Sequence, residues 1–79
     1  MRYLASEKAS KIIKSLGFYE ETSGVFILES RKIVFTPEGI ELYSVERGSL
    51  GNDYLESKLN FIPDKKVFLI DLIKRTFYL

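Results

Sequence analysis

The 79-residue chain contains no cysteine, no histidine and no tryptophan, and the first two absences each exclude a class of protein. Without cysteine the chain is not a disulfide-stapled secreted domain, which favours a reducing compartment. Zinc prefers thiolate and imidazole ligands, so a zinc site is not expected. The chain also lacks histidine, the commonest general base in enzymes, and cysteine, the thiol nucleophile. We therefore expect no metal, no cofactor and no enzymatic activity.

Long apolar runs are also missing. The longest, Val67 to Ile70, is too short to span a bilayer, and the N-terminal residues contain no apolar stretch typical of a signal peptide. The 12 basic and 11 acidic residues give a net charge of +1, which provides no global attraction to nucleic acid or to anionic membrane. We predict a cytoplasmic protein that does not bind membranes.

The composition that is present is that of an ordinary globular protein. Hydrophobic residues make up 46% of the chain and charged residues 29%, which argues against disorder. The length allows one domain, residues 1–79. A chain of this size buries only about 60% of its unfolded surface, so its core is small. Because disulfides are excluded, we expect tight packing and a partner subunit together to supply the stability of the protein.

The first predicted element is a helix from Ser6 to Leu16. Ser6 is a suitable N-cap, and Gly17 is a typical left-handed stop after the helix. Residues 18–24 follow as a connector with a polar, turn-like end. The helix has one apolar stripe at the helical period, formed by Ala5, Ala9, Ile12, Ile13 and Leu16.

The middle of the chain, from Val25 to Glu46, predicts a three-stranded antiparallel meander because β-branched and aromatic residues are frequent there. Within it, Thr36-Pro37-Glu38-Gly39 predicts a hairpin turn in which Gly39 takes the left-handed position. The same residues also suit a helix start, with Thr36 as N-cap and Pro37 in the first turn; residues 37–47 are then helical. The two structures are alternatives on the sequence alone.

The last third of the chain predicts two helices. Asp53 to Asn60 begins with a suitable N-cap and has Glu56 at the third helical position. Asp64 to Tyr78 begins with a second such cap, and a buried strand from Val67 to Ile70 is its alternative. The predicted fold class is therefore α+β, with an N-terminal helix, a three-stranded antiparallel meander, a short helix and a C-terminal helix.

Part of the chain resembles a known family. The segment from Ile12-Ile13-Lys14 through Phe35-Thr36-Pro37-Glu38-Gly39-Ile40-Glu41-Leu42 looks like the second half of a winged-helix domain. The likeness consists of a recognition helix, a hydrophobic step, a hairpin wing and a helix opening on Thr-Pro-Glu-Gly, over less than half of the chain. It implies a DNA-binding regulator whose C-terminal helices replace those that precede the recognition helix in the family. A winged-helix-like fold is thus the alternative architecture.

The apolar face of the last predicted helix is wider than the stripe of an ordinary surface helix. Aromatic residues make up 14% of the chain, more than one small core needs, and aromatic surfaces are typical of protein interfaces. The alternative is that these aromatic residues pack in the core of the protein. The candidate interface residues are Phe68, Leu69, Leu72, Ile73, Phe77 and Tyr78.

Basic residues form a second candidate surface. Three lysines share the side of the first helix opposite its apolar stripe, and a basic pair lies at a predicted hairpin tip, where a DNA-binding wing would place cations. Neither group of residues needs a ligand to explain it. The three lysines can form an ordinary solvated helix face, and the basic pair can keep a strand edge soluble. The candidate nucleic-acid contacts are Arg2, Lys8, Lys11, Lys14, Arg31 and Lys32.

No catalytic motif adds to these surfaces. The chain has no phosphate-binding glycine loop and no Gly-x-Ser-x-Gly sequence. We therefore predict a small non-enzymatic binding module that acts through protein–protein contacts, either as a homodimer or with another protein. A nucleic-acid-binding regulator with a winged-helix-like hairpin is the alternative.

Overall fold

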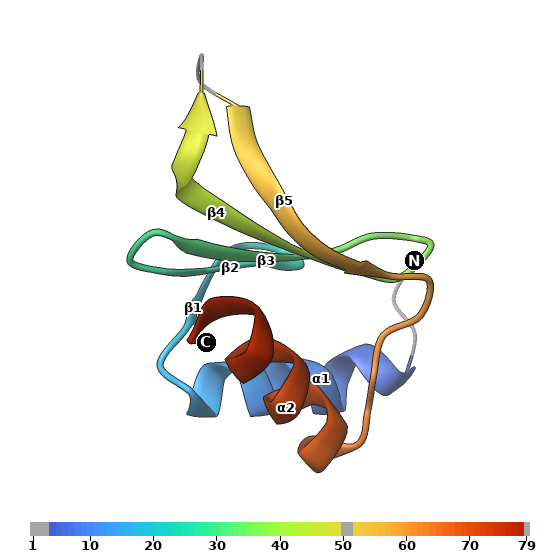
Figure 1. The fold of residues 1–79 in the computed structure, drawn as a ribbon. Helices are drawn as coiled ribbons and strands as arrows, with labels where there is room; N and C mark the ends of the chain where they lie inside the picture. The colour runs from blue at the N-terminus through green and yellow to red at the C-terminus, as the bar shows by residue number, and fades with distance from the viewer. Residues whose placement is uncertain (1–3, 50–51, 79) are drawn as a thin grey trace.

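The computed structural model describes residues 4–49 and 52–78, which form two helices and five strands. The strands make one antiparallel sheet in the order β1-β2-β3-β4-β5, and both helices cover the same face of it (Figure 1). The predicted α+β class is confirmed. The predicted arrangement is only partly correct, because the sheet has five strands instead of three and there is no short helix before the last one among the described residues.

Helix α1 spans Leu4–Ser15 and buries Ala9 and Ile13 against the rest of the molecule. Gly17 follows with a φ of 104°, so the predicted left-handed stop is confirmed. Strand β1, Tyr19–Thr22, then forms in the segment expected to be a connector. Three of its four residues are exposed, so it lacks the apolar alternation by which a strand is recognised.

The predicted meander is present as β2 (Val25–Leu28), β3 (Arg31–Phe35) and β4 (Ile40–Ser49). Phe26 pairs with Ile33, and Ile33 pairs with Leu42, so these three side chains form one row across the sheet. All three are fully buried beneath the helices. Burial of alternate residues on one face fixes the register of these strands.

Residues 36–39 form the hairpin turn and not the start of a helix. Thr36 and Gly39 exchange backbone hydrogen bonds of 2.7 and 3.2 Å around Pro37 and Glu38. The prediction of a left-handed Gly39 is wrong, because the positive-φ glycines of the described chain are Gly17 and Gly24. The segment that a winged-helix domain would fold as a helix is therefore strand β4.

The predicted helix from Asp53 to Asn60 is instead strand β5, Asn52–Leu59, paired along β4. Helix α2, Lys66–Phe77, confirms the last predicted helix and replaces the strand alternative. Its N-cap is Lys65, in an extended conformation and without a side-chain cap, so the predicted capping role of Asp64 is wrong.

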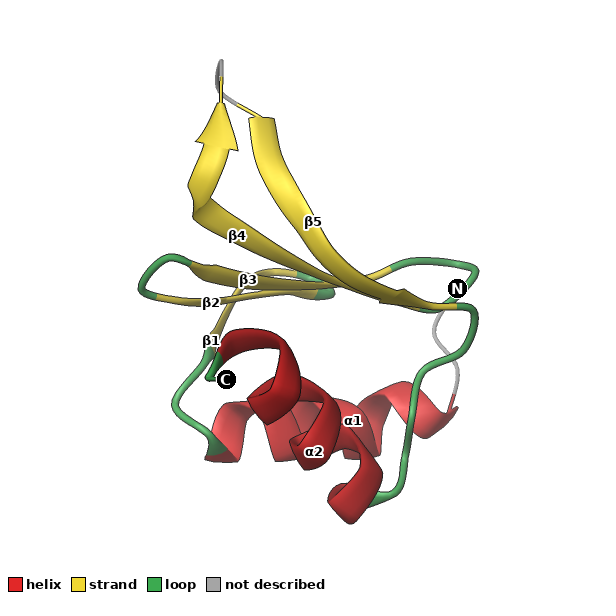
Figure 2. Cartoon of the chain, in the orientation of Figure 1, coloured by secondary structure: helices red, strands yellow, loops and turns green. Residues whose placement is uncertain are grey.

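The core lies between the sheet and the two helices (Figure 2). No helix in the described part of the chain is long and apolar enough to cross a membrane. The buried apolar residues come from both layers and are Ala9, Ile13, Phe18, Phe26, Ile33, Ile40, Leu42, Leu69, Leu72 and Ile73.

Candidate functional site

The apolar face of α2 lies mainly in the core of this single chain. Leu69, Leu72 and Ile73 are buried between the sheet and α1, and Phe77 packs against Phe18 with ring centroids 6.4 Å apart. Leu69, Leu72 and Ile73 are therefore not available on the surface of the chain, and Phe77 is only partly exposed. The width of the face follows from its position, because α2 packs against both a sheet and a neighbouring helix.

Two of the six candidate interface residues are exposed. Phe68 is 39% exposed and stacks on Phe61 with ring centroids 6.0 Å apart. Tyr78 is 52% exposed, and the guanidinium of Arg31 lies 4.3 Å from the centre of its ring. The two residues flank α2 at its opposite ends, so they do not form one patch along the helix.

The candidate nucleic-acid contacts are divided between different sides of the molecule. Lys8, Lys11 and Lys14 are exposed on α1, and Lys14 bridges to Glu20 over 3.3 Å. Lys32 precedes the buried Ile33 and therefore lies on the sheet face that points away from the helices. Arg31 is engaged by Tyr78 and by Glu29 at 3.1 Å, and Arg2 lies outside the described residues. The structure does not gather these cations on one surface.

The sheet face opposite the helices is uncovered in the part of the chain that the structure describes (Figure 1). A row of paired residues crosses it in the order Tyr19, Ile27, Lys32, Tyr43 and Leu55. Its end members, Tyr19 and Leu55, are 60% and 44% exposed. This face is therefore partly apolar and partly aromatic, with polar groups at its centre.

Those polar groups neutralise one another. Lys32 Nζ lies 2.8 Å from an Asp53 carboxylate oxygen, and Lys58 Nζ lies 3.8 Å from Glu41. The Tyr43 hydroxyl donates a 2.6 Å hydrogen bond to Glu41, and this bond, with burial and the charges of Glu41 and Asp53, raises the pKa of Tyr43 to about 12. Among the residues whose side chains the structure describes, these two acids and two bases balance each other in charge, which suits a protein surface better than a phosphate backbone.

The two edges of the sheet differ. Strand β1 has four residues and a register shift, whereas β5 has eight residues at the other edge. Leu42 pairs with Ser57 and Tyr43 with Leu55, so Glu56 is the extra residue of a β-bulge in β5. Bulges redirect side chains at sheet edges. At this one, Glu56 lines a groove together with residues of α2.

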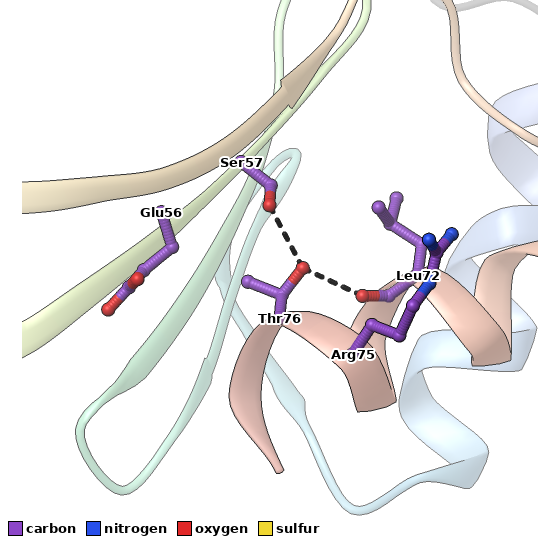
Figure 3. Close-up of a pocket in the computed structure, with 5 residues that line it drawn as sticks. All are labelled: Glu56, Ser57, Leu72, Arg75 and Thr76. Atoms are coloured by element: carbon purple, nitrogen blue, oxygen red, sulfur yellow. Dashed lines mark hydrogen bonds between the residues drawn. The ribbon is translucent and has the colours of Figure 1, made fainter. Parts of the chain in front are cut away.

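An open groove of about 290 Å³ lies between β5 and α2. We call it the edge groove; its lining residues are Glu56, Ser57, Leu72, Arg75 and Thr76 (Figure 3). Except for Leu72, which is mostly buried, these side chains are polar or charged. Grooves between an edge strand and a helix are places where extended peptides can add to a sheet.

A pair of hydroxyls joins the two walls of the edge groove. The Thr76 hydroxyl donates to the Leu72 carbonyl at 2.7 Å, and Ser57 Oγ lies 3.0 Å from Thr76 Oγ1 (Figure 3). Since a hydroxyl has one proton, Ser57 must be the donor in the second bond. The lone pairs of Ser57 Oγ are then available as acceptors beside the edge of β5.

Opposite charges flank this hydroxyl bridge. Figure 3 shows Glu56 on one side of it and Arg75 on the other, with Arg75 displaced in the direction in which β5 runs. Arg75 is held by Asp71 one turn earlier on α2, with Nε 3.0 Å from the carboxylate. Both side chains of that pair are more than half exposed, and a guanidinium has five N–H donors, so Arg75 can bind a second carboxylate.

The edge groove offers binding groups and not a catalytic arrangement. None of the lining residues is a histidine, a cysteine or a lysine. The two hydroxyls of the groove therefore have no such side chain beside them to activate them. Within residues 4–49 and 52–78, no group of three or more acidic side chains is placed to hold a metal ion. What the groove provides is a strand edge, hydroxyl acceptors and one charge of each sign.

No protein-family model, no curated protein and no solved structure matches this chain. The functional conclusion therefore rests on the geometry of the edge groove alone.

Sequence patterns did not identify the edge groove. Glu56 and Ser57 fall in the segment predicted to be a helix, and neither Arg75 nor Thr76 is among the candidate site residues that the sequence predicts. A charged residue amid a polar strand gives no periodic signal, and a bulge cannot be read from one sequence. The groove depends on contacts between segments about 19 residues apart, as in the Ser57–Thr76 bond.

Proposed function

We propose that this protein is a small binding module that takes an extended segment of a partner protein as an additional strand on β5. The observation that carries the proposal is the edge groove, because it places the longer edge strand of the sheet beside a helix wall with polar side chains. Backbone hydrogen bonds to β5 would supply affinity, and the groove side chains would supply selectivity.

Two further observations support a protein partner. The outer edge of β5 has no strand paired with it among the described residues, so it is the end of the sheet at which a long strand can be added. The adjacent open face of the sheet is aromatic and carries balanced charges, which is the composition of a protein-binding surface.

The test is selection of random eight-residue peptides on the purified protein, followed by NMR titration of a selected peptide. We expect amide shifts concentrated in β5 and in the C-terminal half of α2. N-methylation of alternate peptide amides should abolish binding, because it removes the hydrogen bonds of an added strand.

A matched pair of variants separates the edge groove from general charge effects. Arg75→Ala removes a groove cation, whereas Lys11→Ala removes an exposed cation on α1. Binding should weaken in the first variant and stay unchanged in the second. Shifts confined to the open sheet face, or no loss upon N-methylation, would refute strand addition.

Nucleic-acid binding is a second candidate function. The two helices together contain six basic and two acidic residues, and Lys8 and Lys11 are exposed on α1. This candidate requires duplex binding at low salt that weakens steeply as salt is added. A gel-shift experiment with random duplex and micromolar protein tests it, with Lys8→Glu/Lys11→Glu as the variant that should lose binding.

A further inference from the structure

We infer that the segment added to β5 carries an aromatic side chain at the end beside Leu59, that an acidic residue accompanies it, and that the aromatic side chain binds against Phe61 and Phe68. We call these two residues the aromatic pair. The inference rests on the proposed strand addition and specifies the chemistry of the partner. It is carried by the position and the exposure of the aromatic pair.

Both walls of the edge groove lead to the aromatic pair. The strand wall continues from Ser57 through Leu59, the last residue of β5, to Phe61. The helix wall leads back from Thr76 to Phe68, which lies about two turns or about 12 Å earlier on α2. Ser57 Oγ lies 3.0 Å from Thr76 Oγ1, and the two rings of the pair are stacked with centroids 6.0 Å apart. The aromatic pair therefore lies beyond the groove in the direction in which β5 runs.

Helical spacing places Phe68 on the groove side of α2. Phe68, Leu72 and Thr76 follow one another at intervals of four residues, so they share one side of the helix. Leu72 and Thr76 line the edge groove, and Phe68 continues the same wall. We therefore expect a large side chain of a segment bound beside Leu59 to reach the aromatic pair.

The aromatic pair is exposed and yet held in position. Phe61 is 52% and Phe68 39% exposed, and the adjacent Val67 is 82% exposed. Ile62 packs against the core and Pro63 is buried, so the loop that carries Phe61 is anchored. Aromatic side chains that are already fixed are effective anchors for a partner, because they lose little conformational freedom when it binds.

Two lysines beside the aromatic pair favour an acidic partner. Lys65 and Lys66 are exposed, and neither forms an ion pair with another residue in the described part of the chain. Together with the preceding Asp64 they leave one excess positive charge here, and the first turn of α2 has no acidic residue. A carboxylate beside the aromatic side chain of the partner complements this charge.

A segment of another protein fits this surface better than the other occupants do. In a two-fold dimer through the aromatic pair the same surface faces itself, so the excess positive charges of Lys65 and Lys66 are brought together. Like charges placed against each other oppose association. Single-stranded nucleic acid also stacks on aromatic rings, but it follows a groove of many cations, whereas the edge groove has one charge of each sign.

The experiment compares three labelled peptides of eight residues and identical composition on one Val/Thr framework, with Asp-Phe at the N-terminal end, in the centre or at the C-terminal end. Fluorescence anisotropy should show the wild-type protein binding one of the two terminal placements about tenfold more tightly than the central one, which is the effect of one aromatic anchor. The N-terminal placement is expected, because an antiparallel strand has its N-terminal end beside Leu59. Preference for the C-terminal placement would support the same anchor on a parallel strand.

Variants test each contact separately. Phe61→Ser/Phe68→Ser should bind all three peptides alike, whereas Tyr19→Ser, which removes an exposed ring at the opposite edge of the sheet, should keep the preference. Lys65→Gln/Lys66→Gln should weaken binding of the preferred peptide about threefold and leave its Asn-Phe analogue unchanged. Circular dichroism verifies that each variant is folded, and Phe68→Ser alone serves if the double serine variant is not.

The outcomes distinguish the two proposals. Equal binding of the three peptides by the wild-type protein, still abolished by N-methylation, overturns the aromatic anchor and leaves strand addition standing. The inference is also overturned if Phe61→Ser/Phe68→Ser keeps the preference, dissociates a wild-type dimer or loses binding to a labelled oligothymidylate. An unchanged affinity in Lys65→Gln/Lys66→Gln overturns the acidic residue of the partner. No binding of any peptide at millimolar concentration overturns strand addition itself, together with the inference built on it.

Discussion

Gly39 lies where two segments of backbone approach each other closely. A Cβ at this position would overlap the Leu59 carbonyl and the Phe61 amide at the end of β5. Glycine is needed here because of that contact and not because of a left-handed backbone. The hairpin turn therefore also holds the end of β5 against the start of β4.

Gly39→Ala should destabilise the protein by about 2 kcal/mol, because the overlap is with backbone atoms that cannot rotate away. Urea denaturation measures the change in the free energy of unfolding. Glu38→Ala, in the exposed part of the same turn, is the control and should change stability by less than about 0.5 kcal/mol. Equal effects of the two substitutions would show that the close approach does not matter.

Tyr43 gives a pH-dependent signal from the open face of the sheet. Its pKa of about 12 lies above the ordinary value of about 10, first because of the hydrogen bond to Glu41. The neutral phenol is thus favoured by folding, so its stabilising contribution is present below pH 10 and is lost as pH rises through 12.

Spectrophotometric titration of the tyrosines should contain a component near pH 12 that disappears in Tyr43→Phe. In Glu41→Gln the pKa of Tyr43 should fall towards its ordinary value, because the accepting carboxylate and its charge are removed. A titration of Tyr43 that is unaffected by Glu41→Gln would show that this hydrogen bond is not the main cause of the shift.

At the scale of the element, β5 explains why a strand can be mistaken for a helix. Asp53 and Glu56 have the spacing of a helix cap, and Leu55 and Leu59 are four residues apart. In the folded protein, pairing with β4 decides the conformation, and the charged residues are tolerated because β5 is an edge strand. Polar edge strands show little of the alternation by which strands are predicted, and the same holds for β1.

The hydroxyl bridge connects β5 to α2 and forms part of the edge groove. Ser57→Ala and Thr76→Val should each destabilise the protein by about 1 kcal/mol, the usual net contribution of a hydrogen bond. Because the two residues share one bond, the double variant should lose about 0.5 kcal/mol less than the sum of the single losses. A denaturation cycle over the four proteins measures this coupling, and strict additivity would mean that the bond contributes nothing.

At the scale of the whole molecule, burial distinguishes two residues that the sequence placed on one interface. Leu72 is 8% exposed and belongs to the core, whereas Phe68 is 39% exposed. Leu72→Asp should cost more than about 3 kcal/mol, enough to unfold much of a small protein, because it buries an unpaired charge. Phe68→Asp should leave the chain folded.

Thermal unfolding followed by circular dichroism checks both variants, and sedimentation equilibrium reports their oligomeric state. A folded but dissociated Leu72→Asp protein would place Leu72 at a subunit interface instead. Homodimerisation is still a prediction; wild-type dimers that dissociate upon Phe68→Asp would locate the interface at the start of α2.

The sequence predicted the parts of the molecule in which local and tertiary signals agree. Helix α1, the central strands and helix α2 each bury a continuous apolar face. The periodic spacing of the apolar residues that form such a face can be read directly from the sequence. The candidate site depends instead on a bulge, on an edge and on the packing of α2 beside β5. Residues such as Arg75 and Ser57 acquire their roles from neighbours distant in the chain, so no local pattern distinguishes them.

The unequal edges of the sheet also limit how many molecules can assemble through it. Strand β1 is short and includes Glu20 and Glu21, whereas β5 is long, and both strands pair with shifts in register. Once a partner strand covers the edge at β5, the other edge of the described sheet is the four-residue β1, which is a poor template for a second strand. Under the proposed strand addition, we therefore expect complexes formed through β5 to hold one partner per molecule, and a row of molecules joined edge to edge is disfavoured.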